Sequence, residues 1–161
     1  MSDIRLSVII PTLAASGEEV ALALRSVFNQ SRLPDEVMLV SNGQSALQRI
    51  QFDEVKVLRA VSHAGPGQAR NVGATCSTSD YLVFLDDDDV LDSEYLHFVE
   101  DSVSRNNPAQ IVITRLDFNE GGRLTTWDDG RKIPKLPDLL IRNPGVTGSN
   151  LVVERQYFLD S

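Results

Sequence analysis

The chain has 161 residues, with 15 basic and 23 acidic side chains and a formal net charge of −8. This length predicts one domain, residues 1–161, which buries about 70% of the surface that its unfolded chain exposes. The negative charge argues against a nucleic-acid partner, because such proteins present a basic surface to the phosphates.

The sequence also carries signs of its compartment. No stretch approaches the roughly 18 apolar residues that cross a bilayer, and residues 1–6 lack the charged and apolar regions of a secretory signal. The single cysteine, Cys76, excludes an intrachain disulfide and is typical of a reducing compartment. We therefore expect no transmembrane segment and a location in the cytoplasm or at the inner face of the membrane.

The first forty residues predict a strand, a helix and a strand. Residues 6–10 and 36–40 are short, β-prone apolar runs of the kind found in buried parallel strands. Between them, Ser16 and Glu19 form a capping box, and the spacing that follows predicts a helix of about four turns that ends before Pro34. The two strands should be parallel with a right-handed crossover. The residues expected on the inner face of the helix are Val20, Leu24, Val27 and Phe28.

The next segment predicts a short polar helix around residues 44–50, a third strand at 55–58 and a second long helix. Gly65 and Pro66 mark the start of that helix, because glycine at the cap and proline at the first helical position are the expected order. The unpaired N–H groups of a helix N-terminus favour an anion. Arg70 lies one turn inside this helix.

Residues 81–85 predict a buried central strand, and four carboxylates, Asp86 to Asp89, follow it directly. Ligands of open α/β sheets bind at this carboxyl edge. Adjacent negative charges repel one another, so a cation or a set of donors should neutralise them, and hard oxygen ligands suit Mg²⁺, Mn²⁺ or Ca²⁺. On an extended segment, Asp86 and Asp88 would project to the same side. A solvated acidic turn that caps the next helix is the alternative.

The remainder completes an α/β fold with a mostly parallel central sheet and helices on both faces. Leu91 and Leu96 flank Asp92 as a hydrophobic staple around an N-cap, and the helix should run to about residue 105. The later predicted elements are a strand at 111–113, a hairpin turning at Gly121-Gly122, a brief helix at 134–141 and a last strand at 149–153.

Four segments in this order resemble the family 2 glycosyltransferases. They are Ser7-Val8-Ile9-Ile10-Pro11-Thr12, Val40-Ser41-Asn42-Gly43, Gly65-Pro66-Gly67-Gln68-Ala69-Arg70-Asn71-Val72-Gly73 and Phe84-Leu85-Asp86-Asp87-Asp88-Asp89. The resemblance implies a GT-A fold, a Rossmann-like three-layer αβα sandwich. It also implies Mn²⁺ or Mg²⁺, a nucleotide-diphospho-sugar donor, inversion at the anomeric carbon, and an acceptor hydroxyl on a glycan, a lipid or another molecule.

The resemblance also assigns site residues. Asp88 would be the metal ligand, Asp86 would lie by the ribose and the metal, and Arg70 would contact the nucleotide. The nucleotide-binding residues would be Pro11, Thr12, Ser41, Asn42, Arg70, Asp86 and Asp87. Ser41 and Asn42 stand where the family usually has two aspartates, and Leu13-Ala14 stands where an aromatic residue and an asparagine are common. These departures leave the nucleobase open.

The general base is not assigned. An inverting transfer needs a base to take the acceptor proton, and the family supplies it from an acidic pair beyond the strand that residues 149–153 resemble. We expect the base beyond Ser161, where this sequence ends. The spacing of the remaining carboxylates marks none of them as a base: Asp128, Asp129, Glu154 and Asp160.

Two other function classes stay open. One is a non-catalytic module that binds a nucleotide sugar without turnover. The other is a Mg²⁺-dependent phosphotransfer domain, because such domains also gather aspartates at strand ends. The second class needs an aspartate nucleophile with a cation that reaches its phosphoryl group, and no lysine follows a late strand in a suitable place.

Overall fold

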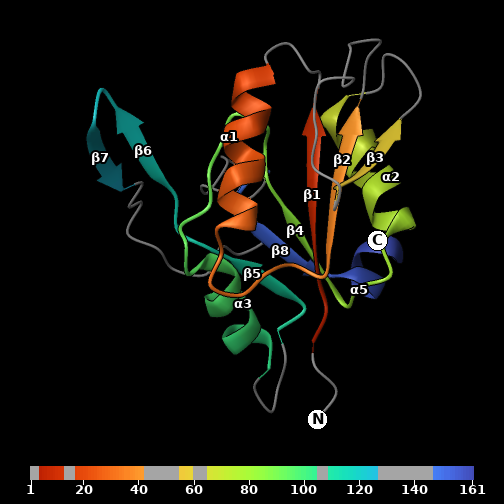
Figure 1. Cartoon of the computed structure of the whole chain (residues 1–161). Helices are drawn as coiled ribbons and strands as arrows, with labels where there is room; N and C mark the ends of the chain where they lie inside the picture. Colours follow the sequence, from red (N-terminus) through yellow and green to blue (C-terminus); the bar gives the residue numbers. More distant parts are fainter. Residues whose placement is uncertain (1–3, 13–16, 42–54, 60–64, 105–108, 127–146) are drawn as a thin grey trace, which may run out of the picture.

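The computed structural model describes residues 4–12, 17–41, 55–59, 65–104, 109–126 and 147–161. Its centre is a six-stranded sheet (Figure 1) with the strand order β3-β2-β1-β4-β8-β5. The strands are β1 (Leu6–Thr12), β2 (Glu36–Ser41), β3 (Val55–Arg59), β4 (Tyr81–Phe84), β5 (Ile111–Ile113) and β8 (Leu151–Glu154). The first four are parallel, and β8 is antiparallel to both β4 and β5. The predicted mostly parallel sheet is confirmed.

Helices cover both faces of this sheet, as Figure 1 shows. They are α1 (Gly17–Phe28), α2 (Pro66–Cys76), α3 (Tyr95–Val103) and α5 (Arg155–Leu159). Side chains alternate along a strand, so Val8 and Ile10 pack with α1 and α3, whereas Ile9 packs with α2. The result is the predicted three-layer sandwich. Four residues were predicted on the inner face of α1. Val20, Leu24 and Val27 are fully buried, and Phe28 is partly buried.

The helix α2 lies very close to the central strand β1. A Cβ atom added at Gly73 would come within 2.5 Å of Cγ2 of Ile9. Real Cβ atoms do not approach other carbons so closely, so glycine at this position lets the helix backbone rest on the sheet. This contact places the C-terminal half of α2, which begins one turn after Arg70, directly against β1.

A separate two-stranded hairpin, β6 (Asp117–Glu120) and β7 (Arg123–Thr126), stands apart from the sheet in Figure 1. Gly121 and Gly122 form its turn with φ values of 61° and 88°, a left-handed conformation that favours glycine. The predicted hairpin is therefore confirmed.

The start of α3 differs from the prediction. Asp92 is not its N-cap: the helix begins at Tyr95 after Glu94, and the Asp92 carboxylate instead accepts a hydrogen bond from the Glu94 N–H at 3.0 Å. The two residues of the predicted staple, Leu91 and Leu96, are both buried. The Ser16 cap and the helices predicted at 44–50 and 134–141 lie outside the described residues.

None of the described helices is long and apolar enough to cross a membrane.

Candidate functional site

The carboxyl ends of the central strands bring the first group of predicted site residues together. In the register of β1 and β2, Pro11 lies beside Val40 and Thr12 lies beside Ser41. Thr12 and Ser41 are almost fully buried. Because β4 runs parallel to β1, the acidic residues that follow it lie at the same edge of the sheet. Asn42 lies outside the described residues.

The four aspartates form a tight turn, residues 86–89, which we call the acidic turn. The Leu85 N–H donates to the carbonyl of Ile9 at 3.1 Å, and the chain then bends so that the Asp89 N–H donates to the Asp86 carbonyl at 3.2 Å. The expectation that Asp86 and Asp88 project from an extended segment is therefore wrong. Their placement follows from the turn, not from strand alternation.

Two side chains from distant parts of the sequence contact the acidic turn. The Nη2 atom of Arg70 forms an ion pair with Oδ1 of Asp86, and the Thr12 hydroxyl donates to Oδ2 of Asp87 at 2.5 Å. Asp88 is exposed and forms no hydrogen bond or ion pair with any residue in the described part of the chain. The turn thus carries more negative charge than its one guanidinium partner neutralises.

The segment before β8 supplies two further site residues that the sequence did not identify. The Asp86 N–H donates to the Ser149 hydroxyl at 2.9 Å. A Cβ atom added at Gly148 would lie 2.0 Å from Nη2 of Arg70. The sequence offers a weak signal, a Gly-Ser-Asn turn before an apolar strand, but nothing in it shows that this strand lies beside β4.

The electrostatics of the acidic turn reflect its crowded charge. Partial desolvation raises the pKa of Asp89 above the ordinary carboxyl value, and the charges of Asp88 and Asp86 raise it further, whereas the hydrogen bond from Ser149 lowers it. Among the described residues, no group of three or more His, Cys, Asp or Glu side chains is arranged to hold a metal ion. A magnesium ion typically takes one or two carboxylates together with substrate phosphates, and the acidic turn offers such oxygens.

The carboxylates considered as a general base are now partly placed. Glu154 pairs with Tyr81 at the amino end of β4, the edge of the sheet opposite the acidic turn. Asp160 is exposed at the end of α5. Asp128 and Asp129 lie outside the described residues.

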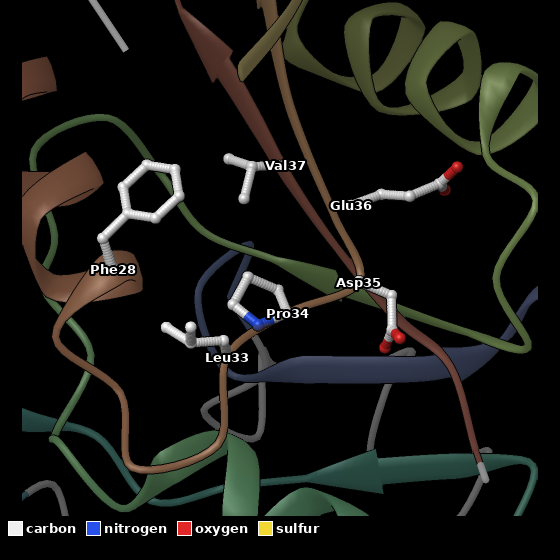
Figure 2. Close-up of a pocket in the computed structure, with 6 residues that line it drawn as sticks. All are labelled: Phe28, Leu33, Pro34, Asp35, Glu36 and Val37. Carbon is white, nitrogen blue, oxygen red and sulfur yellow. The ribbon is translucent and has the colours of Figure 1, made fainter. Parts of the chain in front are cut away.

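A hollow of about 270 Å³ also lies away from the acidic turn. Its lining comes from the end of α1, the segment that follows it and the start of β2 (Figure 2). The acidic turn lies at the opposite edge of the sheet, where the parallel strands end. The lining residues are Phe28, Leu33, Pro34, Asp35, Glu36 and Val37. The hollow is therefore not part of the candidate site.

Comparison with known proteins agrees with this architecture. The family model described as Glycosyl transferase family 2 matches residues 7–158. A curated protein of Haemophilus influenzae, described as an uncharacterized glycosyltransferase, is 34% identical over 104 residues, which are 63% of this chain and 35% of that protein.

Solved structures also resemble this chain. The structure of S. aureus TarS 1-349 in complex with UDP-GlcNAc superposes with a TM-score of 0.72 at 19% identity, over 98% of this chain and 47% of that one. The structure of TarS 1-349 in complex with UDP superposes with a TM-score of 0.71 at 19% identity, over 98% of this chain and 48% of that one. At this identity the likeness shows the fold, and it confirms the predicted GT-A fold. The chain spans about half the length of these structures.

Proposed function

This chain belongs to glycosyl transferase family 2, and we propose that its acidic turn and the neighbouring strand ends bind a nucleotide-diphospho-sugar donor with Mn²⁺ or Mg²⁺. The protein would then transfer the sugar, with inversion, to a hydroxyl of a glycan, a lipid or another acceptor. The observation that carries the proposal is the convergence of Thr12, Arg70 and the acidic turn at one edge of the sheet. Ligands of open α/β sheets bind at that edge.

Arg70 is suited to the diphosphate of such a donor. Its guanidinium lies beside the acidic turn, and its Nε atom is buried without a hydrogen-bond partner in the described part of the chain. Arginine forms strong charge-assisted hydrogen bonds with phosphate oxygens. The helix that carries it begins at Pro66, and the positive N-terminal end of its dipole favours the same anion.

Asp88 is the residue that we expect to hold the cation, with Asp86 beside it. Its carboxylate is exposed on the turn, and carboxylate oxygens are the ligands that Mg²⁺ and Mn²⁺ prefer. A cation bound there would stabilise the negative charge that develops on the leaving diphosphate. The roles of Pro11, Ser41 and Asn42 at the nucleobase stay predictions, as does the cytoplasmic location.

Calorimetry of this chain with UDP, GDP and dTDP, each with and without Mn²⁺, tests the proposal. UDP is the first probe because the related structures were solved with UDP and UDP-GlcNAc. We expect one of the three diphosphates to bind more tightly with Mn²⁺ than without it. If none binds under either condition, the proposed donor site is wrong.

A second assay separates this function from phosphotransfer. A domain that uses an aspartate nucleophile should become labelled by a small phosphodonor such as acetyl phosphate, whereas a donor-binding site of the proposed kind should not. Stable labelling that is lost in Asp86→Asn or Asp87→Asn would favour the phosphotransfer function.

A further inference from the structure

We propose that residues 147–150, which we call the Gly148 turn, hold the acidic turn and Arg70 in the arrangement that binds the donor. This inference rests on the proposed function, because it assigns a positioning role within that site. It gives a role to a segment that lies about sixty residues after the acidic turn in the sequence.

The Gly148 turn is itself firmly held. The Thr147 N–H donates to Oδ1 of Asn150 at 2.8 Å, and the Ser149 N–H donates to the Thr147 hydroxyl at 3.2 Å. Asn150 is fully buried, and its side-chain amide donates to the Thr114 carbonyl at 3.2 Å. The Thr114 N–H in turn donates to the Asn150 carbonyl at 2.9 Å. These bonds fasten the turn to the residue that follows β5.

This anchored turn acts on the acidic turn through one hydroxyl group. Ser149 is 5% exposed, and its hydroxyl oxygen accepts a hydrogen bond from the Asp86 N–H at 2.9 Å. This bond holds the first residue of the acidic turn against the Gly148 turn. Because like charges along the acidic turn repel one another, a bond that fixes Asp86 opposes their separation.

Gly148 acts on Arg70 through the space that it leaves. A Cβ at this position would lie 2.0 Å from Nη2 of Arg70 and 2.5 Å and 2.7 Å from the two carboxylate oxygens of Asp86. Any larger residue would therefore push the ion pair apart or displace the turn. Glycine lets the backbone lie directly against the pair, and the pair keeps the guanidinium beside the acidic turn before a donor arrives. Such preorganisation lowers the free-energy cost of binding.

The first test measures by calorimetry how tightly the Ser149→Ala and Gly148→Ala variants bind UDP in the presence of Mn²⁺. If the wild type binds GDP or dTDP more tightly than UDP, that diphosphate is used instead. We expect each variant to bind about ten- to a hundredfold more weakly, the range for losing the charge-assisted hydrogen bond that Arg70 would make to the diphosphate. Matched controls are Ser104→Ala and Gly17→Ala. Among the described residues, the Ser104 hydroxyl bonds only the Glu100 carbonyl of its own helix, and a Cβ added at Gly17 meets nothing within 4 Å. Both controls should bind as the wild type does.

A structural role alone would lower the urea midpoint and leave the Kd of the folded protein unchanged, so urea unfolding is measured on every variant. The Gly148→Ala effect on binding should also shrink in an Arg70→Ala background, because the side chain that meets the new Cβ is then gone. Unchanged affinity in both single variants, or effects that simply add in the double variant, would overturn the proposal.

The NMR signal of the Asp86 amide gives a readout that needs no donor. In Ser149→Ala this N–H loses its acceptor, so its proton resonance should shift and its exchange with solvent should become about tenfold faster. If the wild type binds no nucleoside diphosphate, the proposed function fails, and the Asp86 amide alone decides the positioning role. An Asp86 amide that is the same in both proteins refutes that role whatever the binding data show.

Discussion

Replacing Glu36 by glutamine should lower the free energy of unfolding by about 3 kcal/mol at neutral pH. The Glu36 side chain is only 11% exposed and points toward α2, away from Phe28 (Figure 2). It accepts hydrogen bonds from the Ser7 hydroxyl at 2.6 Å, the Ser77 hydroxyl at 3.0 Å and the N–H and hydroxyl of Thr78 at 3.0 and 2.8 Å. This carboxylate therefore ties β1 and β2 to the segment that joins α2 to β4.

The size of the effect follows from the pKa of Glu36. Burial alone would raise that pKa, but the hydrogen bonds, led by that from Ser7, outweigh burial and lower the pKa from 4.5 to about 2. A shift of this size is worth about 3.4 kcal/mol at 1.36 kcal/mol per unit. Because the folded-state pKa is the lower one, the stabilisation is fully present above pH 4.5 and disappears as the pH falls toward 2. At pH 3 about 1.4 kcal/mol should remain.

Urea unfolding of the wild type and Glu36→Gln between pH 7 and pH 3 measures this difference. Glu120→Gln is the control, because Glu120 is exposed on the β6–β7 hairpin, and we expect it to change stability by less than about 0.5 kcal/mol. A carbon-detected NMR titration of Glu36 gives the pKa directly. A stability difference that does not change with pH, or a titration midpoint between 4 and 5, would refute the reasoning.

Three further substitutions test the site and the packing. Asp88→Ala should abolish the Mn²⁺ dependence of nucleotide binding in calorimetry without lowering the urea midpoint, because it relieves repulsion in an exposed turn; Asp101→Ala, exposed on α3, is the control. Arg70→Ala should weaken nucleotide binding by about 1.5 to 3 kcal/mol, and an unchanged Kd would leave Arg70 a structural role only. Gly73→Ala should destabilise the fold by about 1 to 3 kcal/mol, because its Cβ would overlap Ile9; equal urea midpoints would contradict that contact.

Much of the candidate site was predictable from the sequence, but its contacts were not. The order of motifs placed Thr12, Arg70 and the aspartates at one sheet edge, because the carboxyl ends of parallel strands meet there. The prediction that the aspartates are extended was wrong, since a short polar segment after a strand carries no periodic signal that distinguishes an extended chain from a turn. The positions of Gly148 and Ser149 depend on the pairing of β8 with β4, which local patterns do not encode.

The sequence by itself determined the helices α1, α2 and α3, most of the strands and the face that α1 buries, whereas the short helix α5 was not predicted. These properties arise from residues a few positions apart, such as the apolar spacing that buries Val20, Leu24 and Val27 in α1. Only the tertiary structure decided that β8 lies antiparallel between β4 and β5, that Arg70 pairs with Asp86, and that the Ser149 hydroxyl accepts a hydrogen bond from the Asp86 N–H. The last of these contacts joins residues about sixty positions apart, and it forms because the sheet brings β4 and β8 side by side.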